Sequence, residues 1–171
     1  YDSGLDHVQV SIQDTDEKNS EKIAGFKGHQ KKINTCKLIR KVGLPLTINS
    51  VMHRQNLHNL KDMIKLAIDL NAERLEVAQV QYYGWALKNQ TAFLPTKEQL
   101  DKATIIVEEA RKTYKGILAI DYVVPDYYAK KPTSGLKAKE DCTKVSSQAP
   151  NIVGSPRRRE KYIASDFFMP R

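Results

Sequence analysis

The side chains best suited to bind a polar ligand interrupt two apolar, strand-like segments, residues 7–13 and 46–52. Polar residues alternate with apolar ones in both segments, and they are Gln9, Ser11, Gln13, Thr47 and Asn49. Successive side chains of a strand point to opposite faces, so each segment presents an apolar and a polar face. Buried polar groups need hydrogen-bond partners, and a bound ligand is one such partner. Mutual hydrogen bonds or buried water serve equally well, and the pattern favours neither alternative.

The usual catalytic and metal-binding patterns are missing. The chain has four histidines, none forming a zinc-binding pair on a common helix face: His7, His29, His53 and His58. Its two cysteines, Cys36 and Cys142, stand 106 positions apart, which is no metal-binding spacing. Cys36 lies in an apolar pattern typical of a core. Glu76 is the best single carboxylate for an interior site, although pairing with a nearby basic residue explains it equally well. We expect no metal ligand.

Residues 81–86, QYYGWA, form a conspicuous aromatic loop after the third strand-like segment. If exposed, its rings can stack on a ligand or a peptide. If folded under the end of the sheet, they serve only as packing, which is the more common role of large aromatic residues.

The elements that must position these residues alternate along the chain. We expect strands at residues 7–13, 46–52, 74–80 and 117–124, with helices at about 29–42, 56–71 and 96–116. Asn56 suits the N-cap of the second helix, and Thr96 with Gln99 forms a capping box for the third. Strands that alternate with helices indicate parallel βαβ units, so the fold class is α/β. Residues 14–28 form a polar, variable stretch to which no element is assigned, and residues 87–95 are expected to be irregular.

The net charge of +8 is concentrated near the end of the sequence. Residues 133–171 hold eight Lys or Arg and four Asp or Glu, including Arg157, Arg158 and Arg159. We interpret this stretch as a disordered basic tail. Nucleic-acid binding is the less favoured interpretation, because no interleaved aromatic residues accompany the charge.

No apolar run reaches the roughly 18 residues that span a bilayer, and we expect a cytoplasmic location. Tyr1 in place of Met suggests a fragment or a processed product.

Four segments together resemble a known family. They are GLDHVQVSIQ at residues 4–13, GLPLTIN at 43–49 with the following His53, Arg54 and Asn56, RLEVA at 74–78 leading into QYYGWA, and PDYY at 125–128. These segments are similar to the fourth to seventh barrel strands of the pyrroloquinoline quinone biosynthesis protein E family, which are radical S-adenosylmethionine enzymes. The resemblance covers about residues 1–132, and the QYYGWA loop is its most specific part.

The resemblance implies roughly the second half of a radical S-adenosylmethionine (β/α) barrel, a partial TIM-like barrel. In this family a 4Fe-4S cluster cleaves S-adenosylmethionine to a radical, which starts a bond between a Glu and a Tyr of a precursor peptide. A small peptide chaperone assists. By resemblance Ser11, Gln13 and Asn49 contact the ribose and amino-acid parts of S-adenosylmethionine, while Gln81 and Tyr82 lie near the substrate at the barrel mouth.

The sequence also departs from the family. The C-x3-C-x2-C loop that binds the catalytic cluster is not present, and after residue 132 the family pattern is lost. We therefore expect a partial barrel at residues 1–132, a non-homologous tail at 133–171, and a chain inactive by itself. A non-catalytic remnant that binds a partner or a peptide is one alternative function, and a basic nucleic-acid-binding module is the other.

Overall fold

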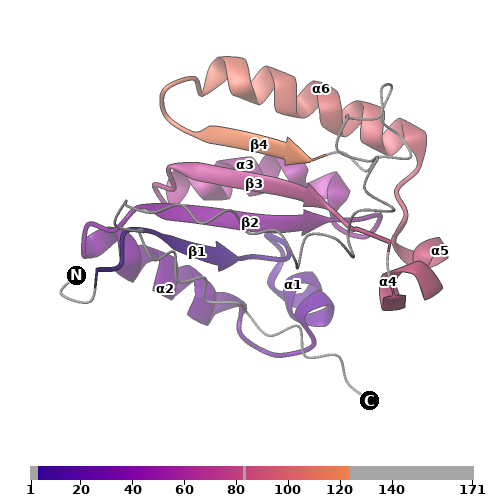
Figure 1. Cartoon of the computed structure of the whole chain (residues 1–171), viewed down its shortest axis with the longest axis horizontal. Helices are drawn as coiled ribbons and strands as arrows, with labels where there is room; N and C mark the ends of the chain where they lie inside the picture. Colours follow the sequence, from indigo (N-terminus) through magenta and orange to yellow (C-terminus); the bar gives the residue numbers. More distant parts are fainter. Residues whose placement is uncertain (1–3, 83, 124–171) are drawn as a thin grey trace, which may run out of the picture.

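The computed structural model describes residues 4–82 and 84–123. Four strands, β1 (Val8–Ser11), β2 (Leu46–Met52), β3 (Arg74–Gln79) and β4 (Ala119–Val123), form one parallel sheet in the order β1-β2-β3-β4 (Figure 1). Each lies within its predicted segment, so the α/β class and the parallel order are confirmed. Four strands do not by themselves define a barrel, and the half-barrel stays a prediction.

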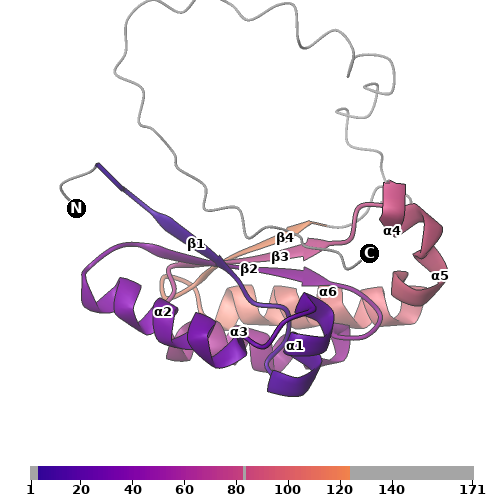
Figure 2. The same ribbon diagram turned by 90° about the horizontal axis from the view of Figure 1, so that it is seen from below.

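The described helices cover only one face of the sheet (Figure 2). This layer consists of α1 (Glu17–Ala24), α2 (His29–Lys41), α3 (Leu60–Asp69) and α6 (Lys97–Thr113). A short 3-10 turn, η1 (Leu57–Asn59), leads into α3. Two further short helices, α4 (Gly84–Lys88) and α5 (Gln90–Phe93), lie beyond the end of β3.

The hydrophobic core fills the space between the sheet and this helical layer. The strand residues that face the helices are almost completely buried, with Leu46, Ile48, Leu75 and Val77 each 0% exposed. The helices α3 and α6 each contribute one buried stripe of residues spaced three or four positions apart. These residues are Leu60, Met63, Ile64 and Ala67 in α3, and Leu100, Ala103, Val107 and Ala110 in α6. Cys36 is also 0% exposed, which confirms its predicted core position.

The structure differs from the sequence analysis at three places. Residues 17–24, to which no element was assigned, form a helix, α1, which begins where the Asp16 carboxylate accepts a hydrogen bond from the Asn19 amide at 2.7 Å. This helix has few apolar residues, and the residue that it buries is Ser20, so its sequence offers no apolar stripe from which to predict it. Much of the stretch 87–95, expected to be irregular, also forms helix, in α4 and α5.

The third difference concerns Asn56, which was predicted to cap the second helix but makes no side-chain capping hydrogen bond. Its side chain is 0% exposed and bonds instead to the chain segments that follow β1 and β2.

The capping box predicted at the start of α6 is confirmed in full. The Thr96 hydroxyl accepts a hydrogen bond from the Gln99 amide at 3.2 Å, and the Gln99 side chain accepts one from the Thr96 amide at 2.9 Å.

Replacing Thr96 with Ala should lower the free energy of unfolding by about 1 kcal/mol, because an amide at the start of α6 loses its acceptor. Urea denaturation followed by circular dichroism measures the change. Thr96→Ser keeps the hydroxyl and serves as the matched control. Equal stability of the Ala variant and the wild type would contradict the role of this cap.

Candidate functional site

Leu46, Ile48, Leu75 and Val77 face the helical layer and are fully buried, so the polar residues that alternate with them project from the other face, which no described helix covers (Figure 2). Residues paired in register across parallel strands project on the same side of a sheet. The pairs Ser11–Asn49, Asn49–Glu76 and Glu76–Asp121 therefore form one polar row across all four strands. Sequence reasoning had singled out the first three of these residues, and the strand pairing brings them together.

Several side chains on this face bond to one another. A Gln9 side-chain N–H donates to the Glu76 carboxylate at 2.7 Å, and the His7 ring lies 2.6 Å from the Thr47 hydroxyl. Arg74 and Asp121 form an ion pair at the β3–β4 side. Mutual hydrogen bonding, one of the two alternatives for the polar residues, thus accounts for part of the face.

At the end of β1, a second group of polar atoms converges. Gln13 donates a hydrogen bond to the Ser11 hydroxyl at 3.4 Å and accepts one from the Lys32 ammonium at 2.7 Å. Burial lowers the pKa of Lys32, and its ammonium lies 5.1 Å from the centre of the Phe26 ring. Ser11, Gln13 and Lys32 therefore combine a hydroxyl, an amide and a cation within one connected set.

The sequence analysis did not identify Lys32 as a site residue, although its position on α2 indicates this role. It lies three residues after His29 and four before Cys36, so it borders the buried stripe of α2. A lysine at such a position can extend its charge past the edge of the core towards a strand end.

Gln81 and Tyr82 follow the end of β3, at the end of the sheet towards which the strands run. Gln81 is exposed, whereas Tyr82 is only 8% exposed. Burial of Tyr82 agrees with the packing role considered for the aromatic loop. Tyr83 and the side chain of Trp85 lie outside the described residues.

His53, immediately after β2, is a buried titratable group close to the candidate site. It is 4% exposed, and its Nδ1 accepts a hydrogen bond from the Gln55 amide at 3.2 Å. Its ring packs edge-on against Phe93, with 5.2 Å between ring centres. Burial lowers the pKa of His53, while the nearby Asp14 carboxylate acts in the opposite direction. The Gln55 bond and the lowered pKa both favour the neutral imidazole.

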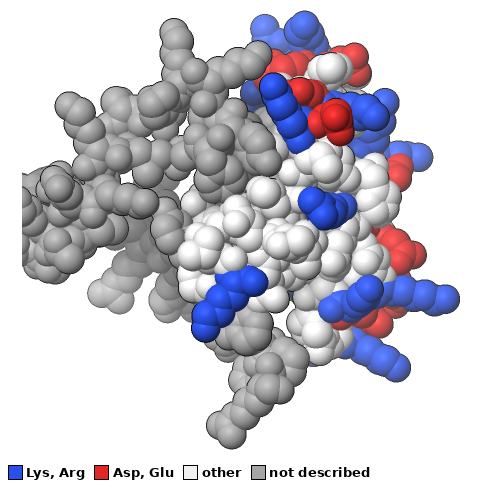
Figure 3. Space-filling view, turned by 90° about the vertical axis from the view of Figure 1, so that its right-hand side faces the viewer, with Lys and Arg blue, Asp and Glu red and all other residues white. Residues whose placement is uncertain are grey.

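The described residues offer no metal centre. They contain no group of three or more His, Cys, Asp or Glu placed to hold an ion. Burial raises the pKa of the Cys36 thiol to about 11, so this thiol is a poor source of thiolate. Cys142 lies outside the described part. Figure 3 views the end of the molecule towards which the strands run, where uncharged residues predominate in the middle, with isolated basic side chains among them, and most charged residues lie along one side.

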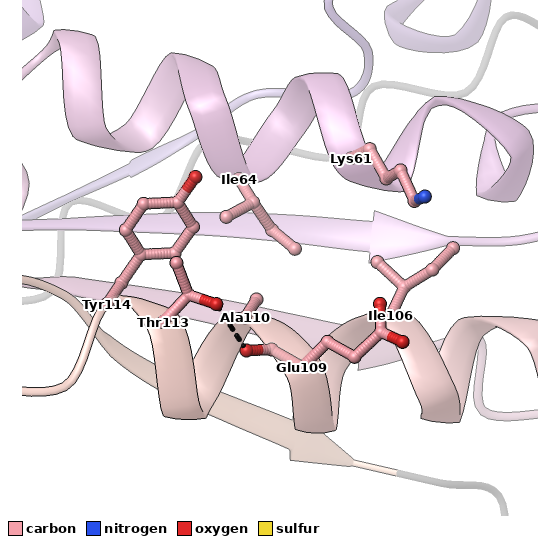
Figure 4. Close-up of a pocket in the computed structure, with 7 residues that line it drawn as sticks. All are labelled: Lys61, Ile64, Ile106, Glu109, Ala110, Thr113 and Tyr114. Atoms are coloured by element: carbon pink, nitrogen blue, oxygen red, sulfur yellow. Dashed lines mark hydrogen bonds between the residues drawn. The ribbon is translucent and has the colours of Figure 1, made fainter.

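A shallow groove of about 210 Å³ lies elsewhere, between α3 and α6 (Figure 4). It is lined by Lys61, Ile64, Ile106, Glu109, Ala110, Thr113 and Tyr114. The Thr113 hydroxyl is occupied within the helix, since it donates to the Glu109 carbonyl at 3.0 Å. None of the predicted site residues lines this groove, and we therefore place the candidate site on the polar face.

None of the described helices is both long enough and apolar enough to traverse a bilayer. The basic tail, with Arg157, Arg158 and Arg159, lies outside the described residues. The hypothesis of nucleic-acid binding depends on that tail and therefore stays a prediction.

Comparison with solved structures defines the class of fold. Streptococcus suis SuiB, crystallised with S-adenosylmethionine, superposes with a TM-score of 0.55 and 18% sequence identity over 68% of this chain and 27% of SuiB. A domain of a pyruvate-formate lyase-activating enzyme from Bacteroides vulgatus gives a TM-score of 0.50 and 9% identity, covering 70% of this chain and 68% of that domain. The chain thus shares its α/β fold with parts of these two proteins.

Sequence comparison identifies the particular relatives. The chain is 58% identical over 132 residues to the PqqA peptide cyclase of Bradyrhizobium diazoefficiens, and 55% identical over 132 residues to that of Rhodopseudomonas palustris. Each match covers 77% of this chain and 35% of the relative. Over these residues the chain is a relative of the PqqA peptide cyclases, which confirms the resemblance that the sequence showed. No protein-family model matches the chain.

The stability of the chain should depend on pH through His53. Because the pKa is lowered in the folded state, the unfolded chain binds a proton first as the pH falls below about 6.5, and the free energy of unfolding decreases. His53→Asn keeps an acceptor for the Gln55 amide but cannot titrate. Urea denaturation between pH 5 and 7.5 should show a steeper loss for the wild type than for this variant. Parallel curves would contradict the lowered pKa.

Proposed function

We propose that this chain supplies one wall of the S-adenosylmethionine site of a radical S-adenosylmethionine peptide cyclase that acts in pyrroloquinoline quinone biosynthesis. The observation that carries the proposal is the convergence of Ser11 and Asn49, on adjoining strands, with Gln13 after β1 and Lys32 of α2, in a chain related to PqqA peptide cyclases. The chain spans about 35% of the length of those relatives, and other sequence must complete the enzyme.

The chemistry of these side chains suits the polar parts of S-adenosylmethionine. A serine hydroxyl and an asparagine amide can bond to ribose hydroxyls, and both Ser11 and Asn49 project from the open face. The Lys32 ammonium suits the carboxylate of the amino-acid part, and Gln13 holds that ammonium at the end of β1. When bound to a reduced cluster, S-adenosylmethionine supplies a radical that abstracts hydrogen. The role of this chain is to bind and orient the cosubstrate.

The iron–sulfur cluster does not fit the residues present. A 4Fe-4S cluster is held by several cysteine thiolates, and this sequence has two cysteines, one of them buried with its pKa raised to about 11. The thiolates must come from sequence beyond these 171 residues. We propose that such sequence adds strands to the free edge of β1 and closes a barrel over the polar face. Without it, the chain is inactive.

We further propose that residues 1–132 form this partial barrel, that 133–171 have a different origin, and that the substrate is a precursor peptide. Streptococcus suis SuiB has been crystallised with its own precursor peptide, SuiA, which supports a peptide substrate for this fold. Gln81, exposed at the end of β3, and the neighbouring Tyr82 are the candidates for contact with the peptide. A small peptide chaperone is a further expected partner.

Binding of S-adenosylhomocysteine, a stable analogue, tests the proposed site. Isothermal titration should show that Ser11→Ala and Asn49→Ala each weaken binding by roughly tenfold, because each loses a hydrogen bond to the ligand. Lys32→Met should weaken S-adenosylhomocysteine but leave 5′-methylthioadenosine, which lacks the carboxylate, unaffected. Asn34→Ala, on the exposed face of α2, is the control. Absence of wild-type binding, or equal loss of both ligands in Lys32→Met, would refute the assignment.

Anaerobic reconstitution with iron and sulfide tests the second part of the proposal. We expect the chain by itself to retain no stoichiometric 4Fe-4S cluster, because two cysteines cannot complete the ligand set. Iron and acid-labile sulfide analysis after desalting gives the measurement. A stable cluster with about four irons per chain would show that the ligands were wrongly placed outside it.

A further inference from the structure

Asn56 holds together two chain segments that would otherwise separate. The last ladder contact between β1 and β2 is the Ile12 amide, which donates to the Asn49 carbonyl at 3.0 Å. One residue later the Asn56 side-chain nitrogen donates to the Gln13 carbonyl at 2.7 Å, and to the Val51 carbonyl at 3.0 Å. The carboxamide thus replaces the backbone ladder at the point where β1 turns away.

The other end of the same carboxamide is also used. The Asn56 side-chain oxygen accepts a hydrogen bond from the His53 amide at 2.7 Å. With three hydrogen bonds and 0% exposure, the side chain is fixed in one orientation. A planar carboxamide can make all three bonds at once, because its nitrogen carries two donors and its oxygen is an acceptor.

Neighbouring side chains reinforce this connection. Asp14 is 1% exposed, and its carboxylate accepts from the Asp16 amide and from the side chains of Asn19 and Asn59, the last at 2.8 Å. Asn59 belongs to the segment after β2, whereas Asp14 belongs to the segment after β1. We call Asp14, Asn56 and Asn59 together the strand-end clamp.

We propose that the strand-end clamp, through Asn56 above all, is a positioning device that fixes Gln13 and Ser11 relative to Asn49. What these residues bind rests on the proposed function, whereas the hydrogen bonds of the clamp and the positions that they fix do not. Gln13 offers its carbonyl to Asn56 and its side chain to Ser11 and Lys32. A shift of the Gln13 backbone therefore moves the whole polar group at the end of β1. Asn56 is accordingly a positioning residue, which need not touch the ligand.

The variant Asn56→Asp separates these roles. The carboxylate has nearly the same shape and still accepts from the His53 amide, but it cannot donate, and it faces the Gln13 and Val51 carbonyls with like partial charge. We expect amide hydrogen exchange by NMR to become at least about tenfold faster at Ile12 and Asp16, while amides of α6 and β4 keep their rates. Asn34→Asp, the same chemical change at an exposed position of α2, should alter neither group.

Affinity for S-adenosylhomocysteine gives the second readout. Asn56→Asp should weaken binding by at least about tenfold, whereas Val107→Ala, which destabilises the core beneath α6 without touching a hydrogen bond of the clamp, should leave the affinity of the folded chain unchanged. A loss caused only by lower stability would affect both variants alike.

The outcomes distinguish the two proposals. Unchanged exchange at Ile12 and Asp16 in Asn56→Asp overturns the clamp, whatever the ligand does. Faster exchange with unchanged affinity shows that the clamp is structural and overturns its positioning role. Failure of the wild type to bind S-adenosylhomocysteine refutes the proposed function, and with it the role of the clamp in ligand placement.

Discussion

The in-register pairing of parallel strands around β2 is the constraint on which the rest of the structure depends. Because side chains alternate along each strand and align across strands, one pattern of residues creates two different faces. Leu46 and Ile48 face the helices and are fully buried, while Asn49, one position along, lies in a polar row with Ser11 and Glu76. Slipping one strand by a single residue would reverse both faces at once. The core and the candidate site therefore share one register.

Much of this arrangement was predictable because it follows from local rules. The strand alternation predicted all four strands, and apolar spacing predicted α2, α3 and α6. The convergence of Ser11 with Asn49 also followed, since it requires only parity and parallel pairing. By contrast, α1 escaped prediction because its stability comes from the Asp16 cap and contacts of polar residues, not from an apolar stripe. The sequence shows no period when a helix packs through such groups.

The roles of Asn56 and Lys32 were not predictable for a different reason. Both depend on partners distant in the sequence: Asn56 bonds to Gln13, 43 positions away, and Lys32 to the same residue, 19 positions away. An asparagine before a helical pattern favours a cap on local grounds, and tertiary contacts override that preference. Polar residues with exact three-dimensional partners are thus the part of a site that a single sequence reveals least.

The one-sided helical layer also determines how this sheet can associate. The uncovered face carries Gln9, Asn49, Glu76 and Asp121, so a polypeptide that covered it would have to bury these polar groups. Burial of polar surface changes the heat capacity with the opposite sign to burial of apolar surface, and it is favourable only where each group finds a partner of matching geometry. A segment that covers this face must therefore match its polar groups one by one, and the opposed contributions of polar and apolar burial would keep the heat-capacity change of the association small.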